Sequence, residues 1–246
     1  MNSKHIAFSC LLLLLACGKK DKNGPDEVLS GDIKQVIETS NDITYKIFTN
    51  VKLTTFKGIL VMGSGNNENN PTPGHLDDAP ENAICKKAAE NGYAAAIVQY
   101  RKTPGTADWN GSSKMIGEDY DQCISAISAQ YDVDKDKSVV GGYSYAGFML
   151  LTNIAYYNSL PYCKGVLVAC GATGADQASK FNNPVFSITC KGNNENGYAG
   201  QALYDLIPAN SPVKAKSEGI TDNSCDTHCG GNWTDKMYAK MVSWLQ

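Results

Sequence analysis

The segment SVVGGYSYAGFMLL, residues 138–151, carries the strongest structural pattern in this sequence. Two valines lead into Gly141-Gly142, a serine follows at position 144, and an apolar run continues from Ala146. A strand that turns sharply into a buried helix, with a serine at the turn and small residues on either side, is the pattern of a nucleophile elbow. The small residues are needed because the backbones of the strand and the helix nearly touch.

This elbow departs from its usual form, G-x-S-x-G, at one position. The chain reads Gly142-Tyr143-Ser144-Tyr145-Ala146, so alanine takes the place of the second glycine. One additional methyl group is small enough for such a turn to hold. The alternative interpretation is a glycine-rich turn whose serine only caps the following helix, and the motif by itself leaves both open.

Around this stretch, short apolar segments alternate with helical ones. We predict strands at 58–62, 93–100, 165–170 and 185–190, and helices at 79–92, 113–131, 200–206 and 234–245. Segments 31–39 and 43–50 flank Asn41-Asp42 and alternate in polarity, which indicates an antiparallel hairpin. The pattern predicts an α/β fold with a mostly parallel sheet and helices on both faces. The active site of such a sheet lies at the carboxyl ends of its strands.

Residues 1–16 predict a lipoprotein signal peptide. An apolar run follows Lys4-His5, is too short to span a bilayer, and ends in Leu-Leu-Ala before Cys17. This ending resembles the lipobox of bacterial lipoproteins, so Cys17 is expected to carry a lipid. An ordinary secretory signal is the alternative. Residues 17–30 are expected to be a flexible tether and 31–246 a single domain, held at the bacterial cell envelope through the lipid alone.

The composition of the 246 residues is that of an ordinary globular domain. It is 42% hydrophobic and 19% charged, with a formal net charge of −3, which excludes a disordered chain. No basic stripe or patch of basic and aromatic residues stands out, so nucleic acid is not an expected partner.

The cysteines are numerous for such a chain and odd in number once the signal and the lipid site are removed. Seven of the nine then remain, so at least one should be free, and a location outside the cytoplasm permits disulfides. Cys225 and Cys229 flank His228 and are expected to hold its loop, paired with each other or with Cys190. No second Cys/His pair stands at ligand spacing, so neither a metal nor a cofactor is predicted.

The order of these elements resembles the α/β-hydrolase fold, in particular its compact secreted esterases, over nearly all of the chain after the tether. The resemblance implies a triad in the order serine, acid, histidine, with Ser144 as nucleophile. His228 is the only histidine after Ser144 and stands before the last helix, so it is the expected base. Glu195, after the strand 185–190, is the favoured acid, and Asp176 is the alternative.

The resemblance also implies an oxyanion hole and a substrate site. One donor should be the backbone N–H of Tyr145, and the second that of Ser64 or Gly65, between which the sequence does not decide. Only 14 residues, 171–184, separate two late strands, which leaves no room for a lid domain. Four aromatic residues lie in loops at the strand ends: Trp109, Tyr143, Tyr145 and Trp233. They are expected to bind substrate; the alternative is that they only pack against their neighbours.

The sequence therefore predicts a serine hydrolase that cleaves carboxylic esters through an acyl-enzyme. Its expected substrates are small-molecule or polysaccharide-linked esters with short-chain, carbohydrate or aromatic acyl groups. A serine peptidase of the same fold and a non-catalytic binding lipoprotein are the alternatives.

Overall fold

The computed structural model describes residues 27–192 and 197–246. Its strands are β1 (Glu27–Ser30), β2 (Ile33–Ser40), β3 (Ile43–Asn50), β4 (Ile59–Gly63), β5 (Ala94–Gln99), β6 (Ser138–Tyr143), β7 (Val166–Ala169), β8 (Val185–Cys190) and β9 (Glu218–Asp222). Its α-helices are α1 (Ala79–Glu90), α2 (Trp109–Tyr131), α3 (Tyr145–Tyr156), α4 (Ala175–Ala178), α5 (Gly200–Leu206) and α6 (Thr234–Leu245). Within these ranges the strands form one sheet in the order β1-β2-β3-β5-β4-β6-β7-β8-β9. Two predicted residues, Cys17 and Glu195, lie outside the described ranges.

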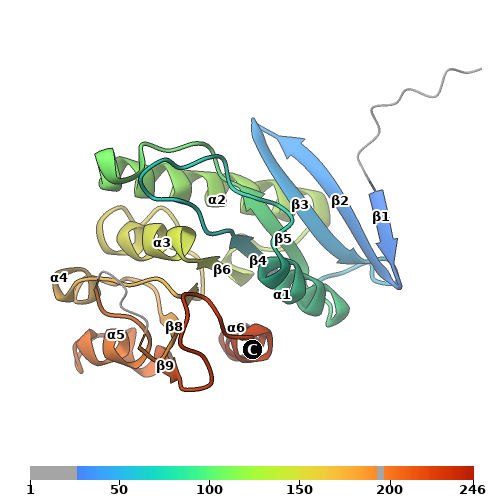
Figure 1. Cartoon of the computed structure of the whole chain (residues 1–246). Coiled ribbons are helices and arrows are strands. Elements are labelled where there is room, and N and C mark those ends of the chain that lie inside the picture. Colours follow the sequence, from blue (N-terminus) through green and yellow to red (C-terminus); the bar gives the residue numbers. More distant parts are fainter. Residues whose placement is uncertain (1–26, 193–196) are drawn as a thin grey trace, which may run out of the picture.

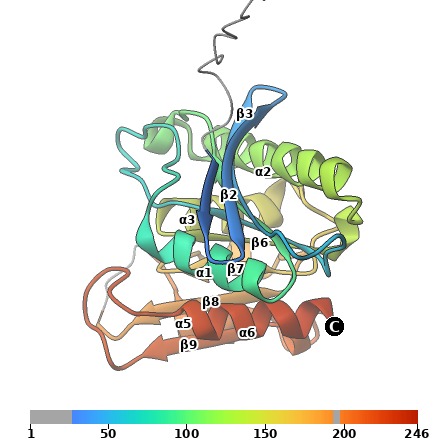
Figure 2. The same ribbon diagram turned by 90° about the vertical axis from the view of Figure 1, so that its right-hand side faces the viewer.

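The predicted hairpin, β2 and β3, belongs to the antiparallel part of the sheet; it lies at one side of the molecule in Figure 1 and faces the viewer in Figure 2. Asn41 and Asp42 both have positive φ, 50° and 65°, as a two-residue hairpin turn with the twist of the strands requires. β3 then pairs antiparallel with β5, which joins the hairpin to the rest of the sheet.

From β5 onward all neighbouring strands are parallel. Side chains alternate between two cores: Ile59 and Val61 of β4 pack on the face covered by α2 and α3, and Leu60 and Met62 on the face covered by α1 and α6 (Figure 1). Because both faces are covered, strands such as β4 (ILVMG) and β7 (VLVA) carry only apolar residues. The predicted mostly parallel sheet with helices on both faces is confirmed.

Residues 27–30 form a strand where the sequence predicted the end of the tether. β1 pairs antiparallel with β2, with Glu27 opposite Val36 and Ser30 opposite Ile33. Gly31 in the turn has a φ of 62°, which glycine adopts without steric cost. Four residues are too few to show the alternation of polar and apolar side chains that is typical of a strand. This strand forms because its backbone pairs with the edge of the sheet. The expectation of a tether up to residue 30 is wrong by these four residues.

The other differences from prediction concern short or half-exposed elements. α2 begins at Trp109, four residues before the predicted start, because the Asp108 side chain accepts a hydrogen bond from the Gly111 N–H (2.8 Å) and caps it. α4 and β9 were not among the predicted elements, since one spans four residues and the other lies at the sheet edge with few apolar side chains. In the described part of the chain, no helix combines the length and apolarity needed to cross a bilayer.

Glu81 is an acidic residue that the fold buries in the first turn of α1. Its exposed fraction is 2%, and its Oε2 has no hydrogen-bond partner among the described residues. Loss of hydration raises the pKa of its carboxyl group from 4.5 to about 7; the Glu81 N–H opposes this shift and the nearby Asp78 charge adds to it. The folded protein therefore keeps this proton at pH values where an unfolded chain has released it.

We expect this proton to make stability fall as the pH rises from about 4.5 to about 7. Glu81→Gln removes the titration. The free energy of unfolding of this variant, relative to that of wild type, should therefore be higher at pH 8 than at pH 5 by about 2–3 kcal/mol. Urea unfolding of both proteins at the two pH values measures this difference. Glu90→Gln, at the exposed end of the same helix, is the matched control. A difference between Glu81→Gln and wild type that did not change with pH would contradict the expectation.

Candidate active site

Ser144 occupies the turn between β6 and α3 in a strained backbone conformation. Its φ is +46° and its ψ −117°, which for a non-glycine residue costs about 1–3 kcal/mol. Two hydrogen bonds hold it there: the Ser144 N–H donates to the Ala169 carbonyl (2.8 Å), and the Ser144 carbonyl accepts from the Phe148 N–H (2.9 Å). The turn thus lifts this side chain out at the carboxyl end of the sheet.

The small residues around Ser144 are required by contact between strand and helix. A Cβ on Gly142 would lie 2.7 Å from the backbone nitrogen of Gly147, closer than atoms can approach. Ala146 is fully buried in the core shared with α2, so the turn holds its methyl group as predicted. The Ser144 side chain makes no capping hydrogen bond to α3. The interpretation of this serine as a simple helix cap is therefore wrong.

The structure brings His228 to Ser144 across 84 positions of sequence. The imidazole Nε2 and the serine Oγ lie 2.8 Å apart, within hydrogen-bond distance. His228 is exposed, on the loop between β9 and α6. A serine hydroxyl and an imidazole in this relation are the first two members that nucleophilic catalysis needs.

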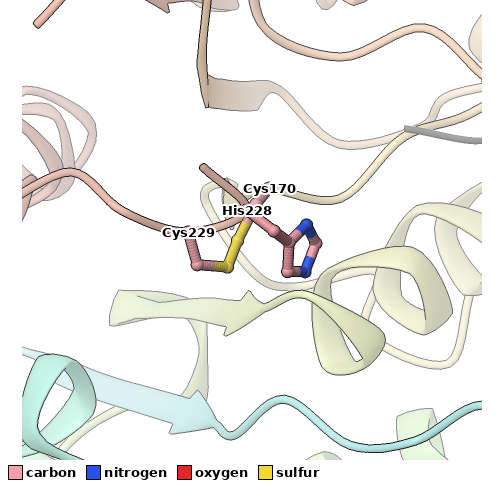
Figure 3. A group of neighbouring side chains, drawn as sticks. All are labelled: Cys170, His228 and Cys229. Carbon is pink, nitrogen blue, oxygen red and sulfur yellow. A yellow bond between two sulfur atoms is a disulfide. The ribbon is translucent and has the colours of Figure 1, made fainter. Parts of the chain in front are cut away.

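The loop that carries His228 is tied to the ends of two neighbouring strands by disulfides. Cys229 forms a disulfide with Cys170, directly after β7, and Cys225 forms one with Cys190, the last residue of β8. Figure 3 shows the first of these disulfides beside the imidazole ring. The sequence offered pairing with each other or with Cys190; Cys225 pairs with Cys190, whereas Cys229 pairs with Cys170, which was not among the alternatives. The expectation that Cys225 and Cys229 hold the loop is confirmed.

Asp222, at the end of β9, fixes the two sides of the same loop. Its carboxylate accepts hydrogen bonds from the Ser224 N–H (2.9 Å), the Ser224 hydroxyl (2.6 Å) and the Trp233 Nε1–H (2.8 Å). These donors, with a smaller contribution from Lys236, hold the pKa of Asp222 well below its usual range. The carboxylate therefore stays charged and keeps the entry and exit of the loop together.

Cys170, His228 and Cys229 bring three potential ligand atoms within 4.8 Å of one another. Metals bind cysteine as the thiolate, and the two sulfur atoms are bonded to each other instead. Three further cysteines, Cys85, Cys123 and Cys163, are buried free thiols among the described residues.

The turn after β4 lies directly against the serine. A Cβ on Gly65 would lie 3.3 Å from the Ser144 Cβ and 3.9 Å from its Oγ, so the Gly65 backbone borders the nucleophile. Ser64 is fully buried and fixes this turn: its Oγ accepts from the His75 N–H (2.7 Å) and its carbonyl from the Tyr100 hydroxyl (3.0 Å). Gly65, one of the two residues that the sequence left open, therefore lies beside Ser144.

Of the two candidate acids, only Asp176 lies in the described residues. Its Oδ2 accepts hydrogen bonds from the Tyr156 hydroxyl (2.9 Å) and the Lys180 ammonium (2.7 Å). These two partners lower the pKa of Asp176. Its carboxylate is thus engaged at the end of α3 that lies away from Ser144.

A cavity of about 740 Å³ opens at Ser144 and His228. Two predicted aromatic residues line it: Tyr145, whose hydroxyl lies 2.7 Å from the Thr103 Oγ1, and Trp109, which packs edge to face on Tyr145. The cavity also receives Phe148, Thr152 and Tyr156, which follow Ser144 at intervals of four along α3. This stripe was not predicted from the sequence, because the apolar run after Ser144 indicates a helix that is buried all round, although the spacing of four was readable.

Two of the predicted substrate-binding residues are placed elsewhere. Tyr143 is 4% exposed and its hydroxyl points at the Met237 sulfur (3.5 Å), because it shares a strand face with Val139 in the core under α6. Trp233 is 1% exposed and donates to Asp222. Neither lines the cavity, so the expectation that they contact substrate is wrong.

Solved structures share the fold of this chain at low sequence identity. S-formylglutathione hydrolase from Agrobacterium tumefaciens matches with a TM-score of 0.64 and 10% identity, over 89% of this chain and 98% of that one. A cold-adapted esterase from an Arctic intertidal metagenomic library gives 0.60 and 12%, over 89% and 95%. The fold is that of the α/β-hydrolases.

Dipeptidyl peptidase 4 from Porphyromonas gingivalis shares the α/β-hydrolase fold with a TM-score of 0.58 and 13% identity, over 87% of this chain and 35% of that one. At the level of sequence, no family model and no curated protein matches this chain. The likeness therefore concerns the fold. In this chain, α4 is the only helix in the described segment between β7 and β8.

We expect the Cys170–Cys229 disulfide to control the position of His228. The double variant Cys170→Ala/Cys229→Ala opens a loop of 59 residues and should lower the free energy of unfolding by about 2–4 kcal/mol. It should also slow the reaction of Ser144 with a fluorophosphonate, because the imidazole is no longer held. Urea unfolding and labelling rates measure both effects.

The matched control is Cys190→Ala/Cys225→Ala, which removes the other disulfide and leaves the residue next to His228 tied down. It should lose comparable stability with a smaller change in labelling rate. Labelling at the wild-type rate in the first double variant would show that this disulfide does not position the histidine.

Proposed function

We propose that this protein is a serine hydrolase that cleaves carboxylic esters. The observation that carries the proposal is the 2.8 Å contact between the Ser144 Oγ and the His228 Nε2 at the apex of a strained strand-to-helix turn. The α/β-hydrolase fold, shared with esterases among its structural neighbours, supports it. The site supplies a nucleophile, a base and a bordering loop of backbone amides in one place.

In the proposed reaction the Ser144 Oγ attacks the ester carbonyl carbon while the His228 Nε2 takes the hydroxyl proton. The carbonyl oxygen becomes an oxyanion, bound by the N–H groups of Tyr145 and Gly65. Tyr145 is the first residue of α3, so its N–H has no partner within the helix. The intermediate collapses as His228 returns the proton to the leaving alcohol. Water, activated in the same way, then releases the acid from Ser144.

We assign the triad acid to Glu195, which lies outside the described residues. The support comes from the two ends of the segment that contains it. Cys190 before it is bonded to the loop of His228, and Tyr198 after it pairs with Thr173, which lines the cavity beside Ser144. Asp176, in contrast, is engaged with Lys180 and Tyr156.

The open cavity favours short acyl groups or acylated polymers over long-chain lipids. Carboxylate, amide and hydroxyl side chains line it together with aromatic rings, which suits a partly polar substrate. A serine peptidase is the second candidate, and the match to dipeptidyl peptidase 4 over 35% of that chain favours it. Hydrolysis of ester and peptide substrates with the same acyl group distinguishes the two.

Ser144→Ala should abolish ester turnover and leave the fold intact. Loss of a triad nucleophile lowers kcat by about 10⁴-fold or more, because no acyl-enzyme can form without it. Turnover of short-chain esters, labelling by a fluorophosphonate and a thermal melt are the measurements. Ser243→Ala, an exposed serine in α6, is the matched control and should behave as wild type. Wild-type turnover in Ser144→Ala would refute the proposed function.

Glu195→Gln should lower kcat strongly while stability and KM change little, because the amide cannot stabilise the imidazolium. Asp176→Asn is its matched control, with the same change of carboxylate to amide, and should turn over short-chain esters near the wild-type rate. The reverse result would assign the acid to Asp176. Wild-type kcat in both variants would mean that His228 acts without either carboxylate.

A further inference from the structure

The cavity continues from Ser144 along one stripe of α3. Phe148, Thr152 and Tyr156 stand one, two and three helical turns beyond the serine and form its floor. At 1.5 Å per residue, Thr152 lies about 12 Å along the helix from Ser144. A small acyl group would fill only the part beside the serine. The rest of the roughly 740 Å³ is room for another part of the substrate.

Thr152 joins the two sides of this second part of the cavity. Its Oγ1 accepts hydrogen bonds from the Trp109 Nε1–H (3.0 Å) and the Gln177 Nε2–H (3.4 Å), and donates to the Phe148 carbonyl (3.1 Å). Trp109 comes from the start of α2 and Gln177 from α4, which lies beside α3 (Figure 1). With one donor and two acceptors engaged, the hydroxyl is fully used inside the protein.

The side chains held by Thr152 have complementary chemistry. The indole of Trp109 is half-buried, has its single donor engaged, and packs edge to face on Phe148 (6.0 Å between ring centroids), so it offers an apolar ring surface. Gln177 is half-buried as well and lines the cavity; its Oε1 accepts from the Thr173 hydroxyl and its Nε2 donates to Thr152, so its amide is held in place. An aromatic surface next to a preorganised polar group fits a ring with apolar C–H faces and a rim of hydroxyls.

We propose that Trp109, Thr152 and Gln177 form a subsite for a sugar ring in the alcohol part of the ester, so that the preferred substrates are acylated sugars. The proposal rests on the ester hydrolysis argued above. Trp109 and Gln177 contact the ring, and Thr152 is a positioning residue that orients both. The acyl group lies at Ser144, and the sugar leaves as the alcohol with the proton from His228.

The test compares two acetyl esters that differ only in their alcohol: a mono-O-acetylated methyl pyranoside and ethyl acetate. Wild type should have the higher kcat/KM for the sugar ester, by about tenfold or more. In Trp109→Leu the ratio of the two kcat/KM values should fall about three- to tenfold, the usual worth of an aromatic contact, mainly through KM for the sugar ester. Gln177→Leu should lower the same ratio through the lost polar contact.

Thr152 provides a matched pair of variants. Thr152→Val keeps the shape of the side chain and removes the hydroxyl, so the ratio should fall as in Trp109→Leu. Thr152→Ser keeps the hydroxyl and should retain the ratio. Tyr157→Leu, which replaces an exposed aromatic residue at the end of α3 outside the cavity lining, should leave the ratio unchanged.

Equal kcat/KM for both esters in wild type, or an unchanged ratio in Trp109→Leu and Thr152→Val, would overturn the subsite. The same holds if a protein whose Ser144 reacts with a fluorophosphonate leaves the sugar ester intact. A preference for the ethyl ester of a hydroxycinnamic acid that Trp109→Leu abolishes would assign the ring to the acyl part and also overturn the proposal. Loss of fluorophosphonate labelling together with all hydrolysis would refute the proposed function itself.

Discussion

The close approach of β6 and α3 at Gly142 is the constraint on which the rest of this site depends. With a Cβ on Gly142 only 2.7 Å from the next helix backbone, the chain can make this turn only with glycine there. The turn forces Ser144 into a positive φ, and the Ala169 carbonyl on the neighbouring strand holds it in place. The strain is confined to this turn, and the packing of the sheet against its helices keeps the turn in this conformation.

His228 must reach this serine from a loop with little buried surface of its own. The protein solves this with covalent bonds: two disulfides join the loop to the ends of β7 and β8, and Asp222 closes it at the end of β9. Each anchor stands at the carboxyl edge of the sheet, where the turn of Ser144 also lies. An exposed loop thereby gains a fixed position relative to a rigid strand end, which a base within hydrogen-bond distance of its nucleophile requires.

The helix that begins at Ser144 has a second role along its length. Most of α3 is buried, yet the residues at intervals of four from the serine face the cavity, so one helix supports both the elbow and the floor of the substrate site. Thr152 links this floor to Trp109 and Gln177 through a single hydroxyl. The shape of the cavity is thus coupled to the element that positions the nucleophile.

Features that follow from local sterics and from periodicity could be predicted from the amino-acid sequence. The small residues around Ser144 predicted the elbow, and Asn41-Asp42 predicted the hairpin. Short apolar segments that alternate with helical ones predicted a sheet covered on both faces. The last histidine in the chain fixed the candidate base, because no other follows Ser144.

Contacts between distant segments were decided only by the tertiary structure. The partners of Cys225 and Cys229 depend on which strand ends meet the loop, and β1 exists only because β2 offers it an edge. The roles of the aromatic residues depend on where each side chain points: Tyr143 shares the inward face of β6 with Val139, whereas Trp109 lies where α2 meets α3. The presence of aromatic residues near strand ends does not show where each side chain points, because the packing of the folded chain decides this.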